Sequence, residues 1–167
     1  KSYIFPDKTW ESRVGIPYAS LILIGLILYW FPAFIITSTS HQASLEVIVL
    51  AICTFSIGVF YHFASDMQKF IFLKNQSGLI TDGFWKQCRH PNYFGECLVW
   101  AGISIMSVEY KAGLSYAALI SPIFSYLLIN YVSGVRMLEN KARKKWGHLD
   151  SYKEYLAKTP KFMPKLF

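Results

Sequence analysis

The sequence predicts an all-α, multi-pass membrane protein with about four transmembrane helices and a short C-terminal helix at the membrane surface. Of its 167 residues, 53% are hydrophobic and 16% are charged, which is more apolar than is usual for a soluble domain. Several stretches approach the roughly 20 helical residues that cross a bilayer core. The basic residues also concentrate between and after these stretches, as they do in membrane proteins with a defined orientation.

The first two predicted spans form a plain hairpin. Residues 15–37 contain no charged side chain, and residues 44–64 contain one, Glu46, near the end where it can reach the interface. Because this hairpin carries little chemistry, we divide the chain into an N-terminal hairpin, residues 1–64, and a C-terminal domain, residues 65–167. No signal peptide is expected, since the first apolar run is too long for one and follows a charged stretch.

Two further spans are predicted at residues 92–108 and 112–133. The first of these is short for a crossing, and the second contains Pro122 and Asn130. A proline in a membrane helix is tolerated when neighbouring groups bind the carbonyl that it frees. We therefore expect Pro122 to kink the helix without ending it.

Charge placement favours an even number of spans. With four crossings, both termini and the loop at residues 65–91 lie on one side, which then holds 16 of the 17 Lys and Arg residues and leaves only Lys111 opposite. The tail from Gly134 contributes +6 of the net charge of +7. We expect this tail to meet anionic lipid head groups or an anionic ligand, and we expect no nucleic-acid partner, because topology already explains the charge.

A cluster of polar residues begins the third predicted span. Arg89 and His90 precede Pro91, which suits the first turn of a helix, and Asn92 can cap that helix. Free backbone N–H groups at such a terminus, next to cationic side chains, predict a phosphate or carboxylate site. Glu96 lies one turn further in, where an acid either faces a functional cavity or pairs with Arg89 to pin the helix end, and both interpretations stay open.

A second polar cluster follows the fourth span. Glu139 and Arg143 form an i to i+4 pair, and residues 150–157 form a short amphipathic helix that places Tyr152 and Tyr155 on one face. The alternative to a binding role is a helix lying on the membrane, and we assign that role to Trp146 and to Lys144, Lys145 and Lys153. Glu139, Arg143 and the tyrosines are expected to help close a ligand site. The three cysteines have no metal-ligand spacing, and no metal is expected.

These two clusters resemble the steroid 5α-reductase-like membrane family, most closely its less characterised branch. The first motif is residues 83–96, GFWKQCRHPNYFGE, followed by Trp100. The resemblance spans about residues 66–164, and a weaker one reaches the isoprenylcysteine carboxyl methyltransferases, which use S-adenosylmethionine. The second motif comprises Ser133, Gly134, Leu138, Glu139, Trp146, Gly147, Tyr152, Tyr155, Thr159, Phe162 and Pro164.

The resemblance implies an integral membrane reductase that binds NADPH in its C-terminal half and reduces an activated double bond in a steroid or isoprenoid lipid. It also implies a set of cofactor contacts, with an acid polarising the enone while the cofactor supplies the hydride. The implied cofactor-binding residues are Asp66, Lys69 and Lys74 in the loop, Arg89, His90, Asn92, Tyr93 and Glu96 at the helix mouth, and Glu139, Tyr152 and Tyr155 in the closing segment.

The chain departs from the family pattern before the first motif. Family reductases carry an acid and a tyrosine that polarise the substrate carbonyl on additional N-terminal helices, whereas here Glu46 is terminal and Tyr18 and Tyr29 have no acidic neighbour in sequence. Three hypotheses follow: an NADPH-dependent lipid reductase, a non-catalytic accessory subunit of a respiratory or photosynthetic membrane complex with an empty pocket, and an S-adenosylmethionine-dependent lipid methyltransferase. Membrane lipids are expected partners in each case, and other subunits in the second.

Overall fold

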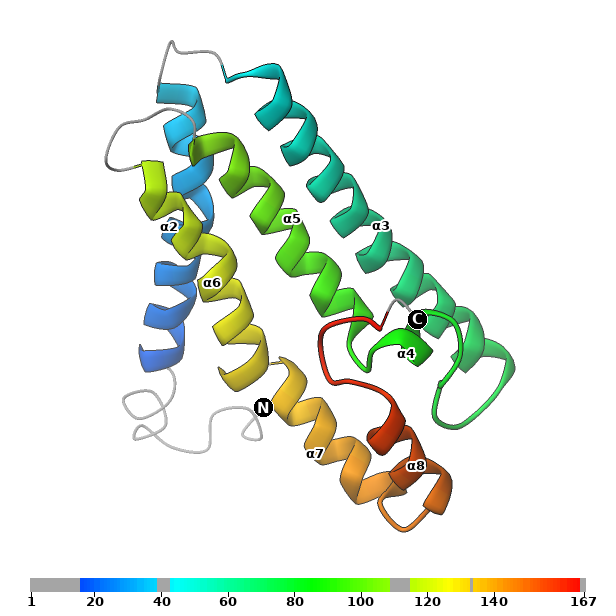
Figure 1. The fold of residues 1–167 in the computed structure, drawn as a ribbon. Helices are drawn as coiled ribbons and strands as arrows, with labels where there is room; N and C mark the ends of the chain where they lie inside the picture. Colours follow the sequence, from blue (N-terminus) through cyan, green and yellow to red (C-terminus); the bar gives the residue numbers. More distant parts are fainter. Residues whose placement is uncertain (1–15, 39–42, 109–114, 133, 166–167) are drawn as a thin grey trace.

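The computed structural model describes residues 16–38, 43–108, 115–132 and 134–165, and these residues form helices and turns without a strand. Expectations that fall on residues 1–15, Lys111 or Ser133 lie outside the described residues. The long helices stand side by side and alternate in direction, while the shorter ones gather at one end (Figure 1). The elements are α2 (Ile16–Ser38), α3 (Leu45–Asn75), α4 (Phe84–Gln87), α5 (Pro91–Val108), η2 (Ser115–Leu119), α6 (Ile120–Leu127), the π-helical segment η3 (Leu128–Val132), α7 (Gly134–Trp146) and α8 (Asp150–Lys158).

By length and composition, three helical segments are apolar enough to span a membrane: Ala19–Ser38, Leu45–Asn75 and Tyr116–Trp146. The prediction of an all-helical membrane protein is therefore confirmed at this level. The predicted span at residues 92–108 forms α5, which is 18 residues long and is not among these three. α5 packs against α2, α3 and α6, so protein covers much of its surface and it needs less hydrophobicity than a lipid-exposed helix.

The second span extends further than the sequence predicted. The apolar span was predicted to end at Ala64, and the same helix, α3, continues to Asn75. Residues 65–75 contain no glycine or proline, and the hydroxyl of Ser65 donates to the Tyr61 carbonyl oxygen at 2.6 Å within the helix. The first glycine after the helix, Gly78, has a φ of 132°, which only glycine adopts readily.

Glycines hold α3 and α5 at close range. A Cβ atom on Gly58 would lie 2.6 Å from the Val99 backbone nitrogen, and one on Gly102 would lie 2.7 Å from the Phe55 backbone nitrogen. A Cβ atom on Gly95 would lie 2.6 Å from the Gly58 carbonyl oxygen. Small residues in this arrangement let membrane helices approach closely and gain dispersion contacts. We call Gly58, Gly95 and Gly102 the glycine seam, and it sets the register of α5 against α3.

A serine from a neighbouring helix binds the carbonyl that each described intrahelical proline frees. Pro32 removes the N–H that would bind the Leu28 carbonyl four residues earlier, and the Ser121 hydroxyl donates to that oxygen instead. Pro122 likewise frees the Ala118 carbonyl, which accepts a hydrogen bond from Ser104 Oγ at 2.9 Å. The expectation that a neighbour would satisfy the carbonyl freed by Pro122 is confirmed.

The Ser104 bond gives a testable prediction. Ser104 and Ala118 are fully buried, so Ser104→Ala should leave the Ala118 carbonyl without a donor and lower the free energy of unfolding by about 1–2 kcal/mol. In a Pro122→Ala background, the new N–H can bind that carbonyl, and the same serine substitution should cost clearly less. Denaturation in mixed micelles of the four variants measures this coupling, and an equal cost in both backgrounds would contradict the assignment.

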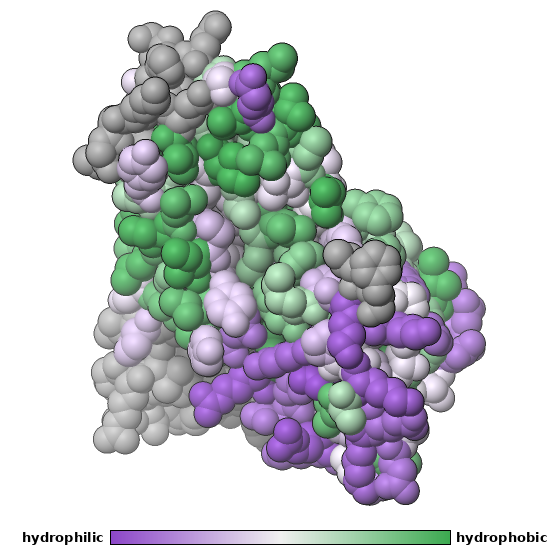
Figure 2. All heavy atoms as spheres, viewed as in Figure 1, coloured by the Kyte–Doolittle hydropathy of each residue, from purple (hydrophilic) through white to green (hydrophobic). Residues whose placement is uncertain are grey.

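The surface divides into an apolar region and a polar one. Figure 2 shows hydrophobic residues over the long helices and hydrophilic residues gathered around α7, α8 and the C-terminal tail. Exposed apolar side chains along α3 include Ile52, Phe60 and Phe63, each more than half exposed. Such a surface suits lipid along the bundle and water or head groups at its end.

Candidate functional site

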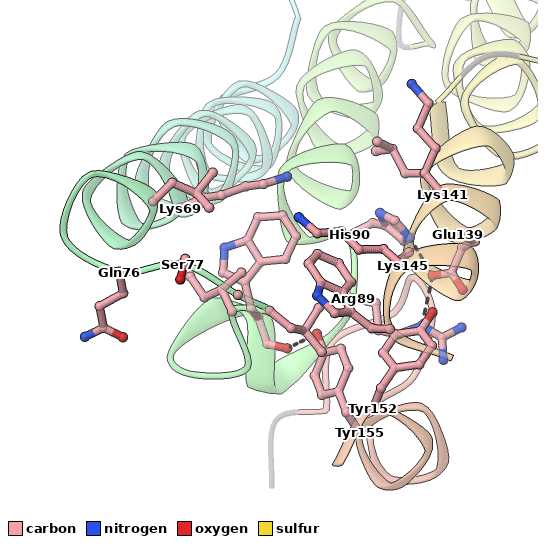
Figure 3. Close-up of a pocket in the computed structure, with 18 residues that line it drawn as sticks. Lys69, Gln76, Ser77, Arg89, His90, Glu139, Lys141, Lys145, Tyr152 and Tyr155 are labelled. Atoms are coloured by element: carbon pink, nitrogen blue, oxygen red, sulfur yellow. Dashed lines mark hydrogen bonds and ion pairs between the residues drawn. The ribbon is translucent and has the colours of Figure 1, made fainter. Parts of the chain in front are cut away.

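A cavity of about 470 Å³ opens at the polar end of the bundle. Its walls come from the C-terminal end of α3 and the loop after it, from α4 and the segment leading to α5, and from α7 and α8 (Figure 3). Six of the residues predicted as cofactor contacts line this one cavity, although they come from distant parts of the chain: Lys69, Arg89, His90, Glu139, Tyr152 and Tyr155.

One carboxylate oxygen joins the two sequence motifs. Glu139 Oε1 accepts a hydrogen bond from Arg89 Nε at 3.1 Å and another from His90 Nε2 at 2.8 Å. All three side chains are mostly buried, with exposed fractions of 16%, 7% and 19% for Arg89, His90 and Glu139. The other carboxylate oxygen, Oε2, accepts no hydrogen bond from the described residues, so it can receive a donor from a ligand.

Arg89 is also bound to the C-terminal end of α8. Its Nη1 donates to the carbonyl oxygens of Leu156 and Thr159 at 3.3 and 3.4 Å, and its backbone N–H donates to the Pro160 oxygen at 2.9 Å. A guanidinium at a helix C-terminus meets carbonyls that lack intrahelical donors. The Arg89 side chain, which we expected to hold a phosphate, therefore already binds three protein oxygens: the carbonyls of Leu156 and Thr159, and Oε1 of Glu139.

Two aromatic side chains fasten α8 and α4 to α3. The Tyr155 hydroxyl donates to the Trp85 carbonyl at 2.6 Å, and Trp85 Nε1 donates to the Ser65 carbonyl at 3.1 Å. Burial raises the pKa of Tyr155, and burial followed by the charge of Glu139 raises the pKa of Tyr152. Both phenols are therefore neutral donors near pH 7.

Three lysines supply the cavity's unpaired positive charge. Lys69 reaches in from α3, with Nζ 4.8 Å from the ring centre of Trp85, and Lys145 reaches in from α7, with Nζ 4.9 Å from the ring centre of Trp146 (Figure 3). Lys141 lies one turn before Lys145 on the same helix and also lines the cavity. None of the three is in an ion pair with a described residue, whereas Arg89 is balanced by Glu139.

The remaining residues predicted at the helix mouth face the bundle interior. Neither Asn92, Tyr93 nor Glu96 lines the cavity. Tyr93 stacks on His90, with ring centres 5.9 Å apart, and so connects the two regions. His62 Nδ1 donates to the Asn92 backbone oxygen at 3.1 Å, while Asn92 Oδ1 is buried without a hydrogen-bond partner among the described residues.

Asn92 does not cap α5 as the sequence predicted. The helix begins at Pro91, so Asn92 lies within its first turn, and the His90 carbonyl accepts the first helical N–H, that of Phe94, at 3.1 Å. The proline fixes the start one residue earlier because its φ already suits a helix. Since no residue of this first turn lines the cavity, we do not place the predicted anion site at the α5 terminus.

An acidic residue and a tyrosine lie near each other inside the bundle. The hydroxyl of Tyr29 on α2 donates to Ser125 Oγ at 3.3 Å, and its ring stacks on Trp100 with centres 4.1 Å apart. Glu96 on α5 lies within electrostatic reach of this hydroxyl. Tyr29 therefore has the acidic neighbour that the sequence did not show, because the partner comes from a helix about 70 positions later.

Two predicted contacts lie away from the cavity walls. Asp66 and Lys74 are exposed on α3 and do not line the cavity. Lys74 lies five positions after Lys69 and so points to another side of the helix, whereas Asp66 lies one turn before Lys69 on the same side and does not reach the cavity.

Sequence reasoning missed several residues that the structure places at these sites. Lys141 was not considered, and Lys145 was assigned to the membrane surface. His62, on α3, was also not considered. The available signal for the two lysines was their i to i+4 spacing, which places Lys141 and Lys145 on one face of a helix. This spacing is also common on solvated helix faces, so it did not single them out.

The described residues hold no group of His, Cys, Asp and Glu that could bind a metal ion. Cys88 is fully buried, and burial raises its pKa to about 11, so its thiol is protonated at neutral pH and is a poor nucleophile. The chemistry of the cavity therefore depends on its lysines, the Arg89–Glu139–His90 cluster and its aromatic rings.

A family profile matches residues 8–159, and the family is described as a protein of unknown function, DUF1295. Neither a curated protein nor a solved structure gives a significant match to the chain.

Proposed function

The chain belongs to the DUF1295 family, and from the cavity that it forms we propose that it is a membrane reductase of the steroid 5α-reductase-like type. It uses NADPH to reduce a carbon–carbon double bond of a steroid or isoprenoid lipid. The observation that carries the proposal is the positively charged, aromatic cavity that unites the two sequence motifs. The first motif supplies Arg89 and His90, and the second supplies Glu139 and two tyrosines.

The charge of the cavity favours a phosphate-bearing cofactor. NADPH carries a pyrophosphate and a 2′-phosphate, and Lys69, Lys141 and Lys145 offer ammonium groups that no described carboxylate neutralises. S-adenosylmethionine carries a sulfonium cation and no phosphate, so the same lysines would repel its reactive centre. The donor set therefore fits NADPH better than the methyl donor.

The uncharged groups of the cavity also suit a nucleotide. Glu139 Oε2 is a free acceptor for a ribose hydroxyl, in the way that an acidic residue binds ribose in other dinucleotide sites. His90 and Arg89 hold the carboxylate in one orientation. The face of Trp146, next to Lys145, provides a surface on which a purine ring can stack.

NADPH, when bound, supplies a hydride to one carbon of the double bond, and a proton from solvent completes the other. The contribution of this chain is to bind, orient and polarise. Trp100 stacks on the ring of Tyr29, whose hydroxyl donates to Ser125 Oγ and would exchange that bond for one to a substrate carbonyl. Glu96 lies within electrostatic reach of this hydroxyl, although no hydrogen bond joins the two side chains. A carbonyl polarised in this way makes the adjacent double bond a better hydride acceptor.

We further propose that α5 is the fourth crossing, shielded by its neighbours. The start of α2 lies at the same end of the bundle as α7 and α8 (Figure 1). Four crossings thus place both termini and the cavity on the positively charged side, as the distribution of Lys and Arg predicts.

Ligand binding tests the proposal directly. The purified protein in lipid nanodiscs is titrated with NADPH, NADH and S-adenosylmethionine. We expect NADPH to bind most tightly and NADH more weakly, because NADH lacks the 2′-phosphate. Stoichiometric S-adenosylmethionine without nucleotide would favour the methyltransferase. Protein that binds none of them and purifies only within a larger assembly would favour the accessory subunit.

Lysine variants test the charge argument. Lys69→Ala and Lys145→Ala should each weaken NADPH binding by about 1–3 kcal/mol, because a charge-assisted bond to phosphate is lost, and the dependence on salt should fall in parallel. Lys153→Ala is the matched control, since Lys153 is exposed and pairs with Asp150 outside the cavity. Equal affinities for the control and for both cavity variants would remove the lysines from the site.

A further inference from the structure

α3 is longer than the hydrocarbon core requires. Its 31 residues extend about 46 Å at the helical rise, whereas the core is about 30 Å thick. At a typical tilt of about 20°, the helix rises about 44 Å along the membrane normal, about 14 Å more than the thickness of the core. Figure 1 shows α3 inclined to α2, which agrees with a tilted helix.

The outer face of α3 stays apolar to its last turns. Phe63, Met67, Phe70 and Ile71 are 67%, 57%, 63% and 50% exposed. Their spacing places them on one side of the helix, as a continuation of the lipid-facing side chains earlier in α3. We call Met67, Phe70 and Ile71 the α3 apolar extension. With Leu45 at the far edge of the hydrocarbon, Phe70 lies roughly 5 Å beyond the near edge.

The inner face of the same turns builds the cavity. Gln68 Nε2 donates to the Asp82 carbonyl at 3.1 Å, and Gln68 Oε1 accepts from the Phe84 N–H at 3.1 Å. Lys69 and Leu73 line the cavity wall. The depth of the α3 apolar extension in the membrane therefore fixes the depth of the cavity.

We propose that the α3 apolar extension lies in the lipid head-group layer, so that the cavity opens at the membrane surface and not in bulk water. The occupant of this face is lipid, because the face is continuous with the surface that the bilayer covers and because Lys74 and Lys86, both exposed, can reach lipid phosphates. A ligand in the cavity then lies next to the head groups. A membrane lipid can then contact the bound ligand without leaving the bilayer, whichever cofactor is bound.

Fluorescence quenching measures the depth. A bimane label is attached to Phe70→Cys in a Cys53→Ser background, since Cys53 is the only exposed cysteine, and the protein is reconstituted into vesicles containing anionic lipid. Iodide in water and nitroxides fixed at shallow or deep lipid positions serve as quenchers. Phe55→Cys, in the middle of α3, is the membrane control, and Ser151→Cys, exposed on α8, is the aqueous control.

We expect the Phe70 label to be quenched most by the shallow nitroxide lipid and several-fold less by iodide than the Ser151 label. Iodide quenching equal to that at Ser151 would overturn the proposal, and so would strongest quenching by the deep nitroxide. Protection from both quencher types would mean that another copy of the chain covers the face, which also overturns it. Met67→Cys repeats the measurement at a second position, and none of these outcomes depends on NADPH binding.

Discussion

Gly95→Ala is expected to remove most of the folded protein, with a loss of at least about 3 kcal/mol in the free energy of unfolding. The new Cβ atom would lie 2.6 Å from the Gly58 carbonyl oxygen and still closer to the His62 backbone nitrogen. Both are backbone atoms, so relief requires α3 and α5 to separate. Separation removes packing contacts from the most extensive helix interface in the described bundle, that between α3 and α5. It also displaces Arg89 and His90, which directly precede α5.

Gly25→Ala is the matched control for this prediction. Its new Cβ atom would lie 3.2 Å from Phe124 Cε1, which belongs to a side chain that can adjust. Yield from the membrane and denaturation in mixed micelles should fall sharply for Gly95→Ala and little for Gly25→Ala. Similar losses for the two variants would show that close backbone approach at the glycine seam does not stabilise the bundle.

Arg89→Ala is expected to release α8 and to disorganise the cavity, with a loss of about 2–3 kcal/mol in the free energy of unfolding. The substitution leaves the carbonyls of Leu156 and Thr159 without their donor and leaves Glu139 with only His90. Removing one member of a mostly buried ion pair is costly because the other charge stays behind. Arg89→Lys should recover less than half, since one ammonium cannot reach all three acceptors.

Hydrogen exchange in residues 150–160 and NADPH affinity separate the roles of Arg89. We expect both protection of α8 and affinity to fall together, because Arg89 positions the wall of the cavity and does not bind the phosphate itself. Arg136→Ala, an exposed change on α7, is the control. A loss of affinity with unchanged protection would instead make Arg89 a direct ligand contact, as the family resemblance implies.

The elements of the fold were largely readable from the sequence because they depend on local patterns. Apolar runs predicted α2, the first part of α3 and the segment around α6. The apolar span was predicted to end at Ala64, whereas the helix runs 11 residues further, because the stretch after Ala64 is amphipathic and keeps an exposed hydrophobic face. The hydropathy of α5 did not predict that this helix lies between α2, α3 and α6. That position depends on how the helices pack together.

The candidate site was partly predictable because two motifs marked it, and five of the six predicted contacts that line the cavity come from these motifs. The motifs could not show that Glu139 joins Arg89 to His90, since about 50 positions separate these partners. They also could not show that Glu96 lies near Tyr29, or that Lys145 lines the cavity. Each of these depends on how two helices rotate and slide against each other.

By itself, the sequence determined the all-helical, membrane-spanning class of the protein and the positions of most helices, because hydrophobicity and helical period act within a single segment. The tertiary structure decided which of the polar residues act together. The glycine seam fixes the register of α5 against α3, and α7 and α8 then bring Glu139 and Lys145 to the cavity. Contacts between distant segments depend on this packing, which no local pattern encodes.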